Sequence, residues 1–180
     1  MNQEMICAGF GGQGVMLMGQ IMTYAGMMED RHVSWMPAYG PEMRGGTANC
    51  SVIISDEPVG SPIVTEPCVV VAMNLPSLDK FEHMLIPGGA LLINSSLIDH
   101  SAKRTDVKAY LVPCNDIAAE LGNPKVANMV MVGAIIAASG AVKVESVLTV
   151  LAKKIFKNKP QAMKVNEEAI RRGMECVTGK

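Results

Sequence analysis

The chain has 180 residues, of which 49% are hydrophobic and 18% charged, and its formal net charge is −1. This length suits one domain that buries roughly 70% of its unfolded surface. The near-neutral charge, with no basic run longer than two residues, argues against a nucleic-acid-binding protein.

The predicted elements alternate between strands and helices. An apolar strand at 5–8 is followed by a glycine loop and a helix that continues to about Met27. A second strand starts at His32, and we expect it to end before Pro37, because proline cannot donate to a central ladder. Further strands are predicted at 48–54, 68–73, 90–94 and 109–112, and further helices at 77–85 (with Ser77 as the N-cap), 115–121, 126–138, 144–156 and 162–177.

This alternation predicts an α/β fold with three α/β/α layers and a mainly parallel, Rossmann-like sheet, in a single domain over residues 1–180. The longest apolar run, 129–138, is far shorter than the roughly 20 residues that cross a bilayer. The N-terminus also lacks the pattern of a signal peptide. The chain is therefore expected to be cytoplasmic, with no membrane partner.

Five cysteines are scattered singly along the chain, and no two are spaced as Cys-x-x-Cys. This spacing argues against a zinc or iron–sulfur site, and we predict no metal ligands in this chain. Their odd number argues against a disulfide framework, so buried free thiols are the favoured interpretation. The residues concerned are Cys7, Cys50, Cys68, Cys114 and Cys176.

The loop after the first strand matches the G-x-G-x-x-G pattern through Gly9, Gly11 and Gly14. A dinucleotide site also needs an acidic residue at the end of the second strand, and that place holds Trp35 and Met36 instead. A tight turn that lets the first helix pack closely explains the glycines equally well. A third hypothesis is that the backbone N–H groups of Gly11, Gly12, Gln13 and Gly14 receive an anion or a partner's carbonyl group.

A second loop, residues 37–46, holds three glycines and two prolines around one acid, one base and one aromatic ring. Glycine and proline fix the backbone, so the loop can present its polar side chains in a set arrangement. We expect it at the same sheet edge as the glycine loop, as a contact site rather than a solvated surface pair. Its candidate residues are Tyr39, Glu42, Arg44, Gly45 and Gly46. No side chains pair as nucleophile and base, so no catalytic residue is predicted.

Several segments together resemble one family. They are GFGGQG, PAYGPEMRGGTANCSVIISDEPVGSP, AMNLPSLDKF, PGGALLINSSL and AAELGNPKVANMVMVGAIIAASG. They are similar to the gamma subunit of the 2-oxoacid:ferredoxin oxidoreductases, over about residues 5–156. The segment YGPEMRGGTAN is the most specific of them, whereas the glycine loop alone would not identify the family.

The resemblance implies a subunit of an enzyme that oxidatively decarboxylates a 2-oxoacid with coenzyme A, giving an acyl-CoA, carbon dioxide and reduced ferredoxin. It places thiamine diphosphate and magnesium in alpha and beta subunits, and 4Fe-4S clusters in a ferredoxin-like delta subunit or domain. No cofactor is expected in this chain, and the isolated chain is expected to be inactive. The favoured substrates are 2-oxoglutarate or a branched-chain 2-oxoacid, with indolepyruvate and pyruvate still open.

On this interpretation, the edge formed by residues 11–14 and 39–46 faces the alpha and beta subunits. Arg44 would pair with a partner carboxylate or help to receive a phosphate of coenzyme A. An apolar partner surface left bare would let the isolated chain form a homodimer. The competing hypotheses are a free-standing dinucleotide-dependent oxidoreductase and an independent Rossmann-like nucleotide-binding or scaffold module.

Overall fold

The computed structural model describes residues 1–40, 46–157 and 159–179. The strands are β1 (Asn2–Phe10), β2 (His32–Tyr39), β3 (Thr47–Ser55), β4 (Val69–Ala72), β5 (Ala90–Asn94) and β6 (Lys108–Val112). The helices are α1 (Val15–Met28), α2 (Leu75–Phe81), α3 (Cys114–Glu120), α4 (Ala127–Ser139), α5 (Val144–Val150) and α6 (Pro160–Thr178). Short 3₁₀ turns lie at Glu82–Met84 and Pro124–Val126, and a π-helical turn, Leu151–Ile155, extends α5.

The strands form one six-stranded sheet in the order β2-β3-β1-β4-β5-β6. β1, β4, β5 and β6 pair in parallel, whereas β3 is antiparallel to both of its neighbours, β1 and β2. The predicted mainly parallel α/β sheet is therefore confirmed. The βαβ pattern does not extend through the whole chain, because β2 and β3 follow each other directly as an antiparallel pair.

The second strand does not end at Pro37, contrary to our expectation from the sequence. Pro37 lies inside β2, opposite Cys50 of β3, and the strand continues to Tyr39. The physical reason is the position of β2 at the edge of the sheet. An edge strand has one unpaired side, where a missing N–H group breaks no ladder hydrogen bond.

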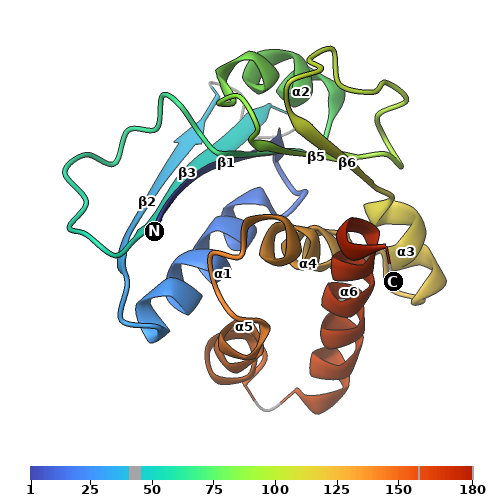
Figure 1. Ribbon diagram of the computed structural model, residues 1–180. Coiled ribbons are helices and arrows are strands. Elements are labelled where there is room, and N and C mark those ends of the chain that lie inside the picture. The colour runs from blue at the N-terminus through green and yellow to red at the C-terminus, as the bar shows by residue number, and fades with distance from the viewer. Residues whose placement is uncertain (41–45, 158, 180) are drawn as a thin grey trace.

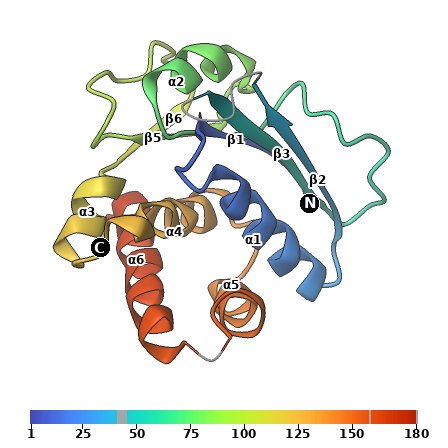
Figure 2. The same ribbon diagram turned by 180° about the vertical axis from the view of Figure 1, so that it is seen from behind.

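Helices cover the two faces of the sheet unequally. Figures 1 and 2 show α1, α3, α4, α5 and α6 on one side, and the short α2 with long loops on the other. Alternate residues of β1 follow this division: Met5 and Cys7 belong to the larger hydrophobic cluster, and Ile6 and Ala8 to the smaller one. The central strands are thus buried on both faces, as their nearly continuous apolar sequences predicted, whereas β2 has no buried residue and β6, also expected to be buried, has only Val112. No helix in the described ranges is both long enough and apolar enough to cross a membrane.

The N-cap residue of α2 differs from the predicted one. The N-cap of α2 is Asn74, whose side chain accepts a hydrogen bond from the Ser77 N–H group at 2.9 Å, so the prediction of Ser77 as the cap was wrong.

α4 is buried over most of its circumference, as its uniformly apolar sequence predicted. It packs closely against α6 where Gly133 and Gly173 bring the two helix backbones together.

All five cysteines are free thiols. Cys7, Cys50 and Cys114 are buried, as predicted, whereas Cys68 and Cys176 are half-buried. Cys7 and Cys50 lie directly opposite each other on β1 and β3. A hydrogen bond with Cys50, together with burial, holds the pKa of the Cys7 thiol well above its ordinary value. The same hydrogen bond lowers the pKa of the Cys50 thiol, so of this pair it is Cys7 that is held as a neutral component of the core.

Candidate functional site at the carboxyl edge of the sheet

The two loops singled out in the sequence lie side by side. β1 ends at Phe10, which is opposite Thr47 at the start of β3, and Tyr39 at the end of β2 is opposite Ala48. The Gly11 N–H group donates to the Gly46 carbonyl oxygen at 3.1 Å and joins the loops directly. The predicted common edge is confirmed, and it is the edge at which open α/β sheets bind their ligands.

The conformation of the glycine loop requires glycine for two separate reasons. Gly12 and Gly14 have φ values of 94° and 75°, in the left-handed region that side chains disfavour. A Cβ atom on Gly14 would also lie 2.3 Å from Nδ2 of Asn128, and one on Gly9 would lie 2.9 Å from Cβ of Met73. Gly14 is the N-cap of α1, so these contacts set how closely α1 and α4 approach the loop.

The Gln13 side chain forms two hydrogen bonds that hold the glycine loop in place. Its Oε1 accepts from the Phe10 N–H group at 2.6 Å, and its Nε2 donates to the Met73 carbonyl oxygen at 3.2 Å. The same carbonyl oxygen accepts from Nδ2 of Asn94 at 3.4 Å, and that nitrogen also donates to Oδ1 of Asn115 at 2.9 Å. Uncharged amide groups therefore span the carboxyl ends of β1, β4, β5 and β6, and they hold the loop without adding charge to the edge.

A hollow of about 440 Å³ opens on one side of the glycine loop, and we call it the polar hollow after the glutamine, asparagine and lysine side chains that line it. The amino ends of α1 and α4 both reach it, and the positive ends of these two helix dipoles favour negative charge. The Asn128 side chain borders the hollow, is only 7% exposed and has no hydrogen-bond partner among the described residues. Lys125 adds a positive charge at the rim. The lining residues are Gly12, Gln13, Gly14, Met73, Asn115, Pro124, Lys125, Ala127 and Asn128.

A second hollow of about 370 Å³, on the other side of the loop, is mainly apolar. Val15, Met16 and Leu17 from the first turn of α1 form one wall, and Phe10 and Tyr39 contribute rings. Tyr39 is 72% exposed, which is unusual for a large aromatic side chain. The edge thus offers a site for an anion beside a site for an apolar or aromatic group.

Three of the predicted residues, Glu42, Arg44 and Gly45, lie outside the described residues. Gly40 and Gly46 flank them, and the Gly40 N–H group donates to the Thr47 carbonyl oxygen at 2.8 Å. The roles proposed for Glu42 and Arg44 therefore stay predictions. The described residues include no cluster of three His, Cys, Asp or Glu side chains that could hold a metal ion.

Comparison with known proteins identifies the family. The model for "pyruvate ferredoxin/flavodoxin oxidoreductase" matches residues 4–176. The chain belongs to this family. It is similar to the ketoisovalerate oxidoreductase subunit VorA of Methanothermobacter marburgensis, with 49% identity over 130 residues that make up 72% of this chain and 27% of VorA. The chain thus spans about a quarter of the length of that relative.

Two further members of the family match over most of both chains. The 2-oxoglutarate synthase subunit KorC of Methanocaldococcus jannaschii is 36% identical, over 81% of this chain and 80% of KorC. The crystal structure of the keto/oxoacid ferredoxin oxidoreductase gamma subunit from Geobacter sulfurreducens is 28% identical, with a TM-score of 0.83 over 99% of each chain. The fold is therefore that of a gamma subunit in this family.

Sequence reasoning missed three side chains of the polar hollow: Asn115, Lys125 and Asn128. They come from the segments before and within α3 and α4, about 100 residues after the glycine loop. One signal was present, because Asn128 is a polar residue in a helix that is otherwise almost wholly apolar. A buried amide of this kind usually has a hydrogen-bonding partner, and here it faces a hollow.

Proposed function

We propose that the chain is the gamma subunit of a 2-oxoacid:ferredoxin oxidoreductase that works in the cytoplasm. The enzyme would convert a 2-oxoacid and coenzyme A into an acyl-CoA and carbon dioxide, with two electrons passed to ferredoxin. The observation that carries this proposal is the likeness to the Geobacter sulfurreducens gamma subunit over 99% of both chains. We place the remaining parts of the enzyme in partner chains.

The cofactors would lie in those partner chains. Thiamine diphosphate and magnesium would be bound by alpha and beta subunits, and 4Fe-4S clusters by a ferredoxin-like delta subunit. The chemistry of the donor set in this chain supports the assignment, because Cys7, Cys50 and Cys114 are buried in the core and the cysteines are dispersed over the fold. This chain would then contribute a surface that shapes the composite site, and it would be inactive alone.

The carboxyl edge of the sheet would be that surface. The polar hollow, with its two helix amino ends and Lys125, suits an anionic group such as a phosphate of coenzyme A. Tyr39 and the apolar hollow suit an apolar side chain of the alpha or beta subunit. Arg44, which belongs to the loop between β2 and β3, would add a guanidinium group for a partner carboxylate or for the same phosphate.

The substrate would be a branched-chain 2-oxoacid or 2-oxoglutarate. The 49% identity to a ketoisovalerate oxidoreductase subunit supports the first, and the 36% identity to a 2-oxoglutarate synthase subunit supports the second. The choice between them would be made by the pocket that binds the oxoacid, which we place in the partner chains.

The test is anaerobic co-expression of the chain with alpha, beta and delta chains of this enzyme class from the same genome. We expect one complex and coenzyme A-dependent reduction of a viologen dye, fastest with one of the two favoured 2-oxoacids. Arg44→Ala should weaken assembly or raise the KM for coenzyme A, whereas the exposed-surface control Lys80→Ala should do neither. If Arg44→Ala changed neither property, both roles of Arg44 would be wrong.

Failure of the chain to join any such complex would overturn the proposal as a whole. Calorimetric titration of the isolated chain with NAD and ADP would then test the independent nucleotide-binding alternative. Light scattering on the same sample would show whether the isolated chain is a homodimer.

A further inference from the structure

Positive charge is concentrated in one short stretch of the chain. Five of its eleven lysines lie within residues 153–164, and no acidic residue occurs between Glu145 and Glu167. Since the net charge is −1, the rest of the chain carries −6. We call this stretch the lysine corner, defined by Lys153, Lys154, Lys157, Lys159 and Lys164.

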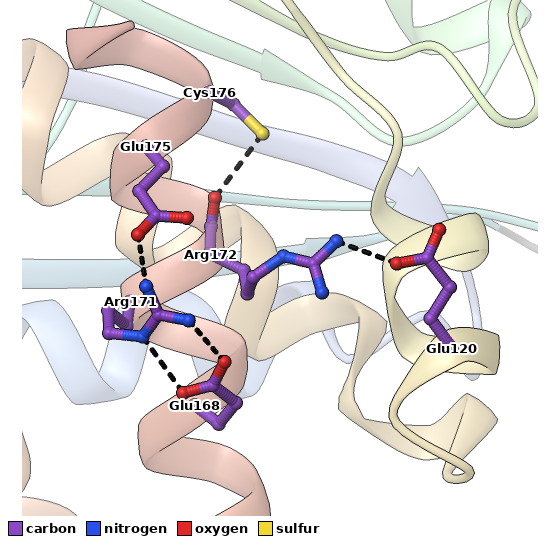
Figure 3. Close-up of polar contacts among 6 residues, drawn as sticks. All are labelled: Glu120, Glu168, Arg171, Arg172, Glu175 and Cys176. Atoms are coloured by element: carbon purple, nitrogen blue, oxygen red, sulfur yellow. Dashed lines mark hydrogen bonds and ion pairs between the residues drawn. The ribbon is translucent and has the colours of Figure 1, made fainter. Parts of the chain in front are cut away.

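All five lysines are exposed, and none forms an ion pair with a carboxylate in the part of the chain that the structure describes. Some basic side chains elsewhere are paired: Lys103 binds Asp79 at 2.7 Å, and Arg172 binds Glu120 at 2.7 Å. Figure 3 shows the second of these pairs, which ties α6 to α3. The lysine corner is therefore a concentration of unpaired positive charge, whereas the other unpaired lysines of the described residues, Lys80, Lys108, Lys125 and Lys143, are spread singly along the chain.

The lysine corner also opposes a local rule of helix stability. The 19-residue helix α6 begins at Pro160 with Lys159 as its N-cap, and its first turn contains no acidic residue. The amino end of a helix carries partial positive charge and favours Asp or Glu, so lysines at this end are destabilising. A segment whose residues disfavour the secondary structure that it adopts is typical of a functional site. An acidic partner would remove the repulsion.

A groove beside the lysine corner offers apolar contact area. It has a volume of about 230 Å³, and α5 and α6 form its walls with Val144, Leu148, Ile170 and Met174, together with the acidic Glu167. Arg171, at its rim, is already occupied by Glu168 and Glu175 (Figure 3). Charge guides association and sets specificity, whereas buried apolar area contributes most of the affinity, and this surface supplies both.

The π-helical turn Leu151–Ile155 and the start of α6 lie on the side of the helical layer that faces away from the sheet (Figures 1 and 2). They are thus separate from the glycine loop and its two hollows. The π-helical turn is anchored, because the Lys154 ammonium group lies 4.2 Å from the centre of the Tyr24 ring on α1. A surface that is both anchored and charged is preorganised for a partner.

We propose that the lysine corner and the adjoining groove form a second docking surface, which binds an acidic segment of another subunit in the same enzyme. This inference rests on the proposed function, because it needs a complex to join. Nucleic acid fits less well, since the remaining charge of −6 would repel it and Phe156, the aromatic residue of this stretch, is half-buried rather than presented for stacking.

The experiment compares two full-length triple variants in the reconstituted complex. The test variant is Lys157→Glu/Lys159→Glu/Lys164→Glu, and the control variant reverses three exposed lysines elsewhere, Lys80, Lys103 and Lys108. Both variants change the net charge from −1 to −7, so a general charge effect is matched. The Kd for assembly with the partner subunits is measured at low salt and near 1 M salt, where the Debye length falls to about 3 Å.

We expect the test variant to assemble about tenfold or more weakly at low salt, with the difference shrinking at high salt, and the control variant to remain near wild type. The test variant should be at least as thermally stable as wild type, because glutamates replace lysines at the amino end of α6. Weak assembly together with retained stability excludes misfolding as the cause.

Assembly of the test variant with wild-type affinity would overturn this inference and leave the proposed function intact. Absence of any complex with wild-type chain would overturn the proposed function itself. Binding of a fluorescent oligonucleotide by wild type, lost in the test variant while subunit assembly is unchanged, would replace the acidic protein partner with nucleic acid.

Discussion

The crossing of α4 and α6 gives a stability prediction that can be worked out from the structure. A Cβ atom added to Gly173 would lie 1.8 Å from the carbonyl oxygen of Val130, and one added to Gly133 would lie 2.0 Å from that of Ile170. Ordinary contact begins at about 3.5 Å, so Gly173→Ala must separate the helices locally by about 1.7 Å. The obstructing atoms belong to the backbone, and no side-chain rotation can relieve the contact.

Separating the helices should lower the free energy of unfolding by more than the higher helix propensity of alanine raises it. Gaps of 0.5–1 Å already forfeit about a quarter to a half of the dispersion energy between facing atoms. Overpacking of a core typically costs about 1–3 kcal/mol, and a displacement of this size belongs near the upper end. Alanine is favoured over glycine within a helix by about 1 kcal/mol. The expected net loss for Gly173→Ala is about 2 kcal/mol, or about 4–8 °C in Tm for a chain of this length.

Urea unfolding followed by circular dichroism tests this expectation: the midpoint should fall with an unchanged m-value. Gly140→Ala separates crowding from backbone strain, because Gly140 has a φ of 60° and free space around its Cβ position. It should lose only about 1–2 kcal/mol from the left-handed conformation. Gly133→Ala/Gly173→Ala should cost less than the sum of the single variants, since one displacement relieves both contacts. A Gly173→Ala chain as stable as wild type would refute the close crossing.

Three further predictions concern other parts of the chain. Gly14→Ala should lower Tm and speed hydrogen exchange at the start of α1, because Gly14 has a φ of 75° and Asn128 fills the space that a Cβ atom would need. Adding Asn128→Ala to this variant should restore part of the lost Tm. Cys114 should resist iodoacetamide in the native chain, because burial raises the pKa of its thiol, and peptide mapping that finds it alkylated before unfolding would contradict this. The Arg171 guanidinium lowers the pKa of Glu168 in the folded chain. The stability gained from this ion pair is present above the unfolded pKa of about 4.3 and disappears as pH falls through the lower folded pKa. The Tm of Glu168→Gln should therefore lie below that of wild type at neutral pH and match it in acid.

Much of the fold follows from local sequence. Strands such as β5 (Ala90–Asn94) were predicted to the residue, because continuous apolar runs bounded by turn residues indicate buried strands. The errors arose where tertiary position decides the outcome. Pro37 is tolerated because β2 is an edge strand, and strand order cannot be read from a single strand's sequence. Asn74 rather than Ser77 caps α2, because Pro76 is accommodated within the first turn and the helix begins earlier.

The candidate site was predictable only in part. The two loops were expected at one edge because carboxyl ends of parallel strands meet there, and the bond from Gly11 to Gly46 bears this out. The contribution of α4 was not predictable, since its contact with the loop depends on how the helical layer packs. Asn128 contacts the Gly14 position from a helix that begins 113 residues later in the sequence, and no local sequence pattern predicts a contact over that separation.

The same geometry explains why a glycine fingerprint here need not bind a dinucleotide. In the Rossmann arrangement, the strand after the first helix lies next to the first strand, and its terminal acid reaches the ribose. In this chain β3 separates β2 from β1, so the end of β2 is displaced by a further strand, to roughly 10 Å from β1. An acid placed there would be too far away to hold a ribose on the glycine loop. The glycines are instead accounted for by the packing of Gly9 and Gly14, which leaves the polar hollow free for an anion that needs no such acid.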